Sequence, residues 1–304
     1  MQSMPVGQYD PTGFATKGDR NMIREGMTAV VTGGAQGIGR SICVALAKRG
    51  VCVYSLDVND KGNKETENRM NLAGSGCHAV HCDVSDAEEI RKNFEEILQK
   101  KGVIDILVNN AAVFSTMSFV KDSYESVLKD WTFNVDTNAR STFLCSKMVA
   151  PAMAQKGLGE IVNIVTNHVK RYLFPPSNSE HSYDASKYAQ LALNESLAEE
   201  LHPYGIRVNA LCPASTRTPM LQEFFDNMGK ELTKETIGQV SGMASLLESE
   251  EVAETCCGIM NWDDSQPVGQ AYLLMYSEDC EELKKGHVAR LARYCLLYTS
   301  DAAD

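Results

Sequence analysis

The residues Val30-Val31-Thr32-Gly33-Gly34-Ala35-Gln36-Gly37-Ile38-Gly39 decide the fold that this sequence predicts. An apolar run, Thr28 to Val31, leads into the glycines, and a helix-compatible run, Arg40 to Arg49, follows them. The order predicts a buried strand, a glycine turn and a helix, which is the beginning of a nucleotide-binding βαβ unit.

The three glycines at a TGxxxGxG spacing fit three separate tasks. Gly33 allows the sharp turn off the strand, Gly37 lets the backbone approach a pyrophosphate, and Gly39 lets the helix pack tightly on the sheet. The helix start then offers unpaired N–H groups and a positive dipole end to the phosphates. We therefore expect a dinucleotide site here rather than a plain glycine-rich turn.

A second strand, Cys52 to Leu56, ends at Asp57. A carboxylate at this position can accept hydrogen bonds from the adenosine ribose hydroxyls, and it would repel a 2′-phosphate. No Arg or Lys directly follows Asp57, and Gln36 in the turn is neutral. The sequence therefore favours NAD over NADP, and the position argues against a capping or loop aspartate.

Composition limits the class of protein. The chain has 304 residues, 43% of them apolar, enough for one large domain or two small ones with an ample core. The formal charge is −11 and no basic run stands out, so nucleic acid is not an expected partner. No apolar stretch reaches the roughly 18 residues of a membrane span. Residues 1–24 are expected to be a flexible extension, without the apolar segment of a secretory signal.

Ten cysteines are scattered along the chain, and most lie in apolar runs, where a buried thiol is expected. No CxxC pair occurs, and the six histidines show no metal-ligand spacing, so no metal site is predicted. These features predict a reduced, cytoplasmic protein.

Expected strands and helices alternate along the chain. The strands are expected at 28–31, 52–56, 77–82, 104–108, 159–165, 206–211 and 271–275, and the helices at 40–49, 60–72, 86–100, 126–153, 183–200 and 250–260. Alternation predicts an α/β fold, a Rossmann-type doubly wound parallel sheet with three α/β/α layers in a single domain. We assign this domain to residues 25–293, with a substrate-loop insert near 219–250, and leave 294–304 unassigned.

Tyr183 and Lys187 lie four residues apart on an expected helix, so they share a face. A free tyrosine has a pKa near 10, and a nearby ammonium stabilises its phenolate. Lowering that pKa to about 7 would take roughly 4 kcal/mol from the lysine and a cofactor's positive ring together. Such a tyrosine could take a proton from an alcohol as hydride leaves the carbon, or return it in reduction.

With these residues in place, the chain resembles the short-chain dehydrogenase/reductase family from about Thr28 to Met220, and more weakly to about Met275. The motifs are TGxxxGIG at Thr32–Gly39, Asp57, Asp83-Val84, Asn109-Asn110-Ala111, Tyr183-x-x-x-Lys187 and Ile206-Arg207-Val208-Asn209. Together they are highly specific to that family.

The resemblance implies a catalytic set of Asn138, Thr166, Tyr183 and Lys187. Asn138 would hold a water in the proton relay, and Lys187 would also hold the nicotinamide ribose. Asp83-Val84 would flank adenine, and Thr218 would contact the carboxamide. The full cofactor site that the resemblance implies consists of Gly33, Gln36, Gly37, Ile38, Gly39, Asp57, Asp83, Val84, Asn110, Tyr183, Lys187, Pro213, Thr216 and Thr218.

Three positions depart from the family pattern. Thr166 aligns with the catalytic serine; it keeps the hydroxyl, but its branched carbon makes the side chain stiffer. The family's Pro-Gly turn is Pro213-Ala214 here, and the glycine pair after the last strand is replaced by Leu274-Met275-Tyr276.

The resemblance implies an NAD-dependent oxidoreductase acting on a secondary alcohol or ketone, with a lipophilic substrate such as a steroid or prostanoid expected. The alternative is a family member that keeps NAD but has lost turnover and acts as a binding protein, which Thr166 and Ala214 would suit. The resemblance also implies a homodimer or homotetramer, built by packing the helices Ser126–Met153 and Tyr183–Glu200 against their copies.

Overall fold

The computed structural model describes residues 23–74, 76–169, 180–241, 244–261 and 268–286. Its centre is a seven-stranded sheet with the order β3-β2-β1-β4-β5-β6-β9, and every neighbouring pair is parallel. The strands are β1 (Thr28–Thr32), β2 (Cys52–Asp57), β3 (His78–His81), β4 (Ile106–Asn109), β5 (Gly159–Ile164), β6 (Ile206–Pro213) and β9 (Ala271–Leu274). The predicted doubly wound fold is confirmed.

The strand order reverses direction between β1 and β4, which are neighbours in the sheet. In open parallel sheets, ligands bind beyond the carboxyl ends of the strands at such a switch point. The glycine turn follows β1, and Asn110 follows β4, so both lie at this position.

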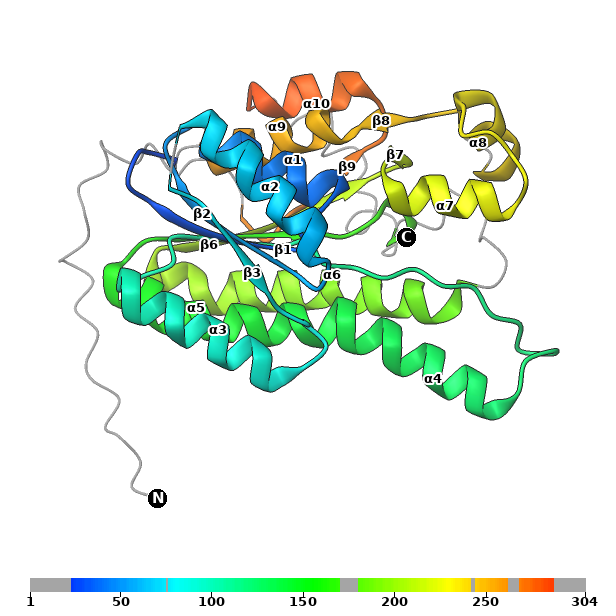
Figure 1. The fold of residues 1–304 in the computed structure, drawn as a ribbon, viewed down its shortest axis with the longest axis horizontal. Helices are drawn as coiled ribbons and strands as arrows, with labels where there is room; N and C mark the ends of the chain where they lie inside the picture. The colour runs from blue at the N-terminus through cyan, green and yellow to red at the C-terminus, as the bar shows by residue number, and fades with distance from the viewer. Residues whose placement is uncertain (1–22, 75, 170–179, 242–243, 262–267, 287–304) are drawn as a thin grey trace, which may run out of the picture.

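Helices cover both faces of the sheet (Figure 1). One face carries α1 (Gly37–Ala47), α2 (Asp60–Ala73), α9 (Ser249–Met260) and α10 (Ser277–Lys284), and the other carries α3 (Ala87–Lys101), α4 (Tyr124–Asn134), α5 (Ser141–Lys156) and α6 (His181–Leu201). Successive β1 residues alternate between the two cores: Ala29 and Val31 pack toward the first group, and Val30 toward the second. This alternation follows from the two-residue period of a strand and makes the three layers.

The helix expected over 126–153 is longer and is not uniform. It begins with α4, where the Ser123 side chain accepts a hydrogen bond from the Ser126 N–H group, and continues through a π-helical turn, η2 (Val135–Arg140), into α5. A sequence pattern cannot distinguish a π turn from an α-helix over so few residues. Single π turns are frequent at functional sites, and this one contains Asn138.

The region near 219–250, which we expected to be an insert, forms two helices, α7 (Pro219–Asn227) and α8 (Lys234–Ser241). Two short strands, β7 (Thr216–Arg217) and β8 (Leu247–Glu248), pair in parallel at its base. Phe225, Leu232, Ile237 and Leu246 form a separate small core beneath the helices. The region is therefore a packed lobe that lies over the carboxyl ends of the strands (Figure 1).

The nine described cysteines are all free thiols, and all except the half-buried Cys52 are buried. Burial raises the pKa of the Cys43 thiol to about 12 and that of Cys82 to about 11. These side chains act as small apolar core residues.

None of the helices in the described ranges combines the length and the apolar character needed to cross a lipid bilayer. Residues 1–22 of the predicted extension, 1–24, lie outside the described residues. The whole unassigned tail, 294–304, also lies outside them.

Candidate active site

The glycine turn leaves the start of α1 open. Gln36, the N-cap residue, is extended and makes no side-chain hydrogen bond to the helix. Gly33 has φ +68°, and a Cβ there would lie 2.7 Å from the Ala111 Cα; a Cβ on Gly39 would lie 2.1 Å from the Gly33 carbonyl oxygen. Only glycine fits at these two positions, and the first-turn N–H groups of α1 stay available to an anionic group.

Asp57 is fixed at the end of β2 by two backbone groups. Its Oδ2 accepts a 2.9 Å hydrogen bond from the Ala35 N–H, and its Oδ1 accepts one of 2.9 Å from the Asn59 N–H. The carboxylate therefore remains at the edge of the glycine turn, where it was predicted to meet the adenosine ribose.

Arg40, which the sequence motifs did not indicate, lies beside this corner. Its guanidinium donates to the Ala35 carbonyl and, at 3.2 Å, to the Gly62 carbonyl, and it forms a 3.2 Å ion pair with Glu65. The arginine thus comes close to the corner that Asp57 occupies, but carbonyls and an acidic partner already bind it. Only folding reveals this, because Glu65 approaches from α2.

A single large cavity of about 1010 Å³ joins the predicted cofactor residues to the predicted chemical groups. Its walls contain every predicted cofactor residue together with Thr166: Gly33, Gln36, Gly37, Ile38, Gly39, Asp57, Asp83, Val84, Asn110, Thr166, Tyr183, Lys187, Pro213, Thr216 and Thr218. Asn138 is not among the residues that line it. The structure thus brings together at one cavity fifteen of the sixteen predicted residues.

Asn110 supports the turn from below: its Nδ2 donates 3.0 Å hydrogen bonds to the carbonyls of Thr32 and Gly33. Its neighbour Asn109 points the other way and donates to Asn163 Oδ1 (2.9 Å) and Ser146 Oγ (3.2 Å). Thr218 caps α7 by accepting from the Leu221 N–H at 3.2 Å. A Cβ on Gly37 would lie 3.1 Å from the Thr218 Cγ2, so the threonine packs directly against the glycine turn.

Tyr183 and Lys187 lie on the first turns of α6, with the Lys187 Nζ 5.8 Å from the centroid of the tyrosine ring. Burial raises the pKa of Tyr183 to about 12, the hydrogen bond with Thr166 lowers it, and the charge of Glu180 raises it. Burial also lowers the pKa of Lys187 to about 7. The protein alone therefore holds the phenol in its neutral, proton-donating form at neutral pH.

Lys187 is 2% exposed. Its Nζ donates to the Ile164 carbonyl at 3.1 Å and to Gln190 Oε1 at 2.8 Å. The Gln190 Nε2 donates in turn to Thr142 Oγ1 at 2.7 Å, and the Thr142 hydroxyl donates to the Asn138 carbonyl at 2.9 Å. A continuous hydrogen-bonded chain thus connects Lys187 to the π-helical turn.

Asn138 itself is fully buried, and its side chain binds two segments. Its Oδ1 accepts from the Val113 N–H at 2.8 Å, while its Nδ2 donates to the Val113 carbonyl at 3.0 Å and to Ser186 Oγ at 2.9 Å. The side chain thus joins η2 to α6 and to the loop after β4. Only the backbone carbonyl of Asn138 connects with the chain from Lys187.

Ala214, in the position where the family pattern has glycine, is 8% exposed and packs in an apolar cluster with Val165 and Leu273. Its methyl group is therefore accommodated. Its N–H still donates to the Leu274 carbonyl at 2.8 Å, which holds the turn after β6 onto the end of β9.

One wall of the cavity is aromatic and was not predicted. Phe114 packs edge-on against Tyr183, with ring centroids 5.0 Å apart, and against Phe224 of α7 at 5.4 Å. Met220 and Met228 also line this part of the cavity. The wall joins the loop after β4 to the lobe made by α7, which no local sequence pattern could indicate.

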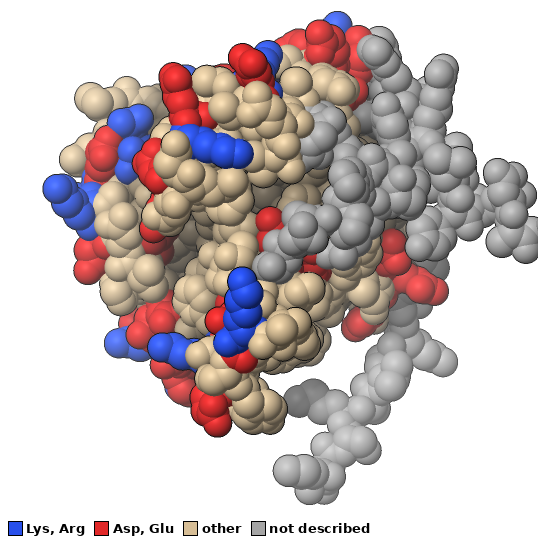
Figure 2. Space-filling view, turned by 90° about the vertical axis from the view of Figure 1, so that its right-hand side faces the viewer, with Lys and Arg blue, Asp and Glu red and all other residues tan. Residues whose placement is uncertain are grey.

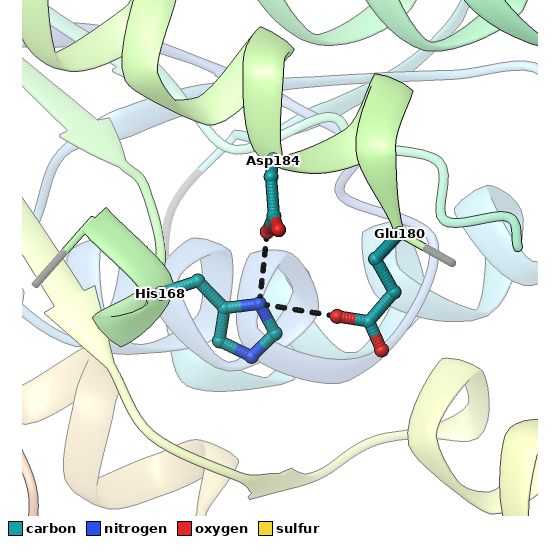
Figure 3. A group of neighbouring side chains, drawn as sticks. All are labelled: His168, Glu180 and Asp184. Atoms are coloured by element: carbon teal, nitrogen blue, oxygen red, sulfur yellow. Dashed lines mark hydrogen bonds and ion pairs between the residues drawn. The ribbon is translucent and has the colours of Figure 1, made fainter. Parts of the chain in front are cut away.

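A polar cluster of one histidine and two carboxylates lines the cavity where α6 begins (Figure 3). His168 Nδ1 lies 3.0 Å from Asp184 Oδ1 and 3.4 Å from Glu180 Oε2, and all three residues line the cavity. Their possible metal-ligand atoms lie within 4.8 Å of one another, although the hydrogen bond between Nδ1 and Asp184 and the ion pair with Glu180 already account for the grouping. No spacing in the sequence indicated this cluster, because its members are separated by up to 16 residues.

Charge on the face shown in Figure 2 is mixed. Basic and acidic side chains alternate around a largely uncharged, hollowed centre, and no continuous basic patch covers the described surface in this view. The described part of this face therefore lacks the continuous basic patch that is typical of nucleic-acid binding.

Comparisons with known proteins agree with this geometry. A family model described as short chain dehydrogenase matches residues 27–229. Farnesol dehydrogenase of Aedes aegypti is 34% identical over 235 residues, 75% of this chain and 87% of that protein. The 3beta-hydroxysteroid dehydrogenase of Mediterraneibacter gnavus is 33% identical over 193 residues, 64% of this chain and 67% of that protein.

Among solved structures, a variant of actinorhodin polyketide ketoreductase with NADPH is 27% identical, with a TM-score of 0.71 over 83% of this chain and 96% of that chain. The fold, the cavity and these similarities agree. This chain therefore belongs to the short-chain dehydrogenase family of oxidoreductases, which bind nicotinamide cofactors.

Proposed function

We propose that this protein is an NAD(H)-dependent oxidoreductase that interconverts a lipophilic secondary alcohol and its ketone. The observation that carries the proposal is the cavity of about 1010 Å³, which has the glycine turn and Asp57 at one end and Tyr183, Lys187 and an aromatic wall at the other. A dinucleotide and a substrate can therefore meet at one tyrosine.

The residues present fit NAD. The open first turn of α1, at Gly37 to Gly39, would hold the pyrophosphate, and Asp57 would accept from the ribose hydroxyls while disfavouring a 2′-phosphate. Lys187 would hold the nicotinamide ribose, and Thr218 would contact the carboxamide. When bound, NAD⁺ supplies the acceptor for the hydride that leaves the alcohol carbon.

Tyr183 would exchange the proton. In reduction its neutral phenol donates to the ketone oxygen, which suits the pKa of about 12 in the protein alone. In oxidation it must first lose that proton, and the positive charge of the cofactor ring together with Lys187 would favour this. The Thr166 hydroxyl would orient the substrate oxygen beside the phenol, as the serine does in the family pattern.

The aromatic wall of the cavity favours a lipophilic substrate. Phe114, Phe224 and the two methionines provide an apolar surface next to the reacting position, which favours an alicyclic or isoprenoid alcohol over a polyol. Relatives with hydroxysteroid and farnesol dehydrogenase in their names are consistent with such substrates.

The competing proposal is a binding protein that keeps NAD but does not turn it over. The replacement of the family serine by Thr166 favours it, and the retained Tyr183–Lys187 pair argues against it.

A panel of secondary alcohols and ketones, followed by NADH absorbance, tests the choice. We expect turnover of at least one lipophilic compound, with loss of that turnover in Tyr183→Phe. Binding of NAD by calorimetry with no turnover across the panel would support the binding protein instead.

We further propose that the protein assembles as a homodimer or homotetramer and works in the cytoplasm. Exposed apolar side chains on α4 and α5 support the assembly, and the free thiols favour a reducing compartment. The extension 1–24, the insert near 219–250 and the tail 294–304 remain our proposed division of the chain.

A further inference from the structure

Two buried carboxylates flank the tyrosine to which we assign the proton transfer. Asp184 directly follows Tyr183 and is 4% exposed, and Glu180 lies three residues before it and is 8% exposed. Negative charge beside a phenol opposes its ionisation. The charge of Glu180 does raise the pKa of Tyr183, so an oxidising enzyme needs something that offsets it.

His168 contacts both carboxylates and the tyrosine ring. Its Nδ1 is 3.0 Å from Asp184 and 3.4 Å from Glu180 (Figure 3). Its ring meets the Tyr183 ring edge-on, with centroids 6.0 Å apart. An ionised carboxylate only accepts hydrogen bonds, so beside ionised Glu180 and Asp184 the His168 Nδ1 would carry a proton, and the two negative charges would favour the imidazolium.

The position of His168 is set by the backbone as well. It is the second residue after Thr166, and its N–H lies 3.5 Å from the Thr166 Oγ1. Tyr188 lies on α6, about one turn after Tyr183, and its hydroxyl lies 3.5 Å from the His168 carbonyl oxygen. The backbone of His168 therefore lies between the end of β5 and α6, and the residue lines the cavity.

We propose that His168 is a positioning residue whose imidazolium offsets Glu180 and Asp184 and so limits the negative charge that the Tyr183 phenol faces. This inference rests on the proposed role of Tyr183 in proton transfer. Among the described residues, Lys187, on the next turn of α6, is the other basic group close to the phenol. His168 and Lys187 then act on the same phenol from two different elements.

A purely structural role is the alternative, in which His168 only ties the start of α6 to the loop after β5. The two roles differ in one measurable respect. A structural role predicts lower stability in His168→Gln with an unchanged pH profile, whereas the proposed role predicts a displaced profile.

The first experiment measures the pH dependence of kcat for alcohol oxidation with NAD⁺, using any compound that turns over. In His168→Gln the acid limb should move up by about one pH unit, the order expected for a unit charge some 6 Å away in a partly solvated site. In the double variant His168→Gln/Glu180→Gln, the acid limb should return toward its position in the parent. In Glu180→Gln alone, the acid limb should lie at a lower pH than in the parent. His202→Gln, at an exposed histidine beyond α6, is the matched control and should leave the limb in place.

The second experiment needs no substrate. The NMR signal of the His168 ring C–H groups is assigned as the one that disappears in His168→Gln. In the parent it should keep its imidazolium position at a higher pH than in Glu180→Gln or Asp184→Asn, by about one pH unit for each lost charge.

The outcomes separate this inference from the proposed function. If Tyr183→Phe keeps turnover, the role of the tyrosine fails, and the inference that depends on it fails too, whatever the charge on His168. If Tyr183→Phe abolishes turnover while His168→Gln leaves the acid limb unmoved, only this inference is overturned. An identical His168 titration in the parent and in Glu180→Gln also overturns it.

Discussion

Lys187 and Gln190 lie one helical turn apart on α6, and the lysine ammonium donates a 2.8 Å hydrogen bond to the glutamine amide oxygen. Both side chains are buried, and Gln190 continues the contact to Thr142. The orientation of the lysine therefore depends on a neutral amide, since none of its described hydrogen-bond acceptors is a carboxylate.

We expect Gln190→Leu to lower kcat about tenfold, because one net hydrogen bond of about 1–1.5 kcal/mol no longer directs the ammonium. Steady-state kinetics on any turned-over alcohol measures this. Gln155→Leu, at an exposed glutamine on α5, serves as the control. An unchanged kcat in Gln190→Leu would show that Ile164 alone fixes the lysine.

Lys187 should reduce the stability of the folded protein in a pH-dependent way. Its pKa falls from 10.5 to about 7 on folding, so the unfolded chain binds the extra proton between those values, and the free energy of unfolding rises with pH across that window. Below about pH 7 the full penalty is roughly 5 kcal/mol.

Lys187→Met removes this penalty but leaves two acceptors without their donor, at a cost of about 1–3 kcal/mol. We therefore expect the variant to be about 2 kcal/mol more stable than the parent at pH 6, with the gain disappearing by about pH 9. Urea unfolding at both pH values measures it. A variant less stable than the parent at pH 6 would contradict a destabilising effect of burying the Lys187 ammonium without a carboxylate partner.

Thr166→Val should isolate the contribution of the hydroxyl, because it keeps the branched shape. We expect kcat to fall by about 100- to 1000-fold, the usual result of losing one donor where charge develops on oxygen. Thr166→Ser should keep most activity, and NAD affinity should barely change in either variant. If Thr166→Val matches the parent, Asn167 or Ser182 orients the substrate instead.

Asp57 should set the cofactor preference. We expect NAD(H) to bind at least tenfold, or about 1.4 kcal/mol, more tightly than NADP(H) by calorimetry, and Asp57→Ala to narrow the gap. Asp60→Ala, at a neighbouring acid that pairs with His81 at 2.8 Å, should leave the preference unchanged. Equal affinity for both cofactors in the parent protein would indicate that Arg40 leaves its present partners to bind the 2′-phosphate.

Apolar side chains on α4 and α5 should be covered by a second copy. Leu128 is 52% exposed, Trp131 49% and Phe143 50%. Light scattering at micromolar concentration should give a dimer or tetramer, and Leu128→Glu should shift it toward monomer. Leu72→Glu, at a 90% exposed leucine on α2 on the other face of the sheet, should not. A monomeric parent protein would disprove the proposed assembly.

The sequence predicted those features that local patterns determine. The order of strands and helices, the glycine turn and the acidic end of β2 all depend on neighbouring residues, so the parallel sheet followed from them. The π-helical turn was missed because it changes the hydrogen-bond register without changing the apolar pattern around Asn138.

The site residues that were not predicted from the sequence were missed for a different reason: their partners are distant in the chain. Gln190 meets Thr142 across 48 positions, His168 meets Asp184 across 16, and Phe114 meets Phe224 across more than 100. A single sequence records neither the distance nor the direction of such contacts. Tyr183 and Lys187 were predicted because they lie four residues apart, about one turn of the same helix.

The buried thiols give the protein a set of internal chemical reporters. Cys43 and Cys256 lie in the core on one face of the sheet, and Cys82 and Cys145 lie in the core on the other. A thiol-alkylating reagent can reach each of them only when the segment that carries it opens. The order in which these cysteines become labelled would therefore show which of the two helical layers comes away from the sheet first.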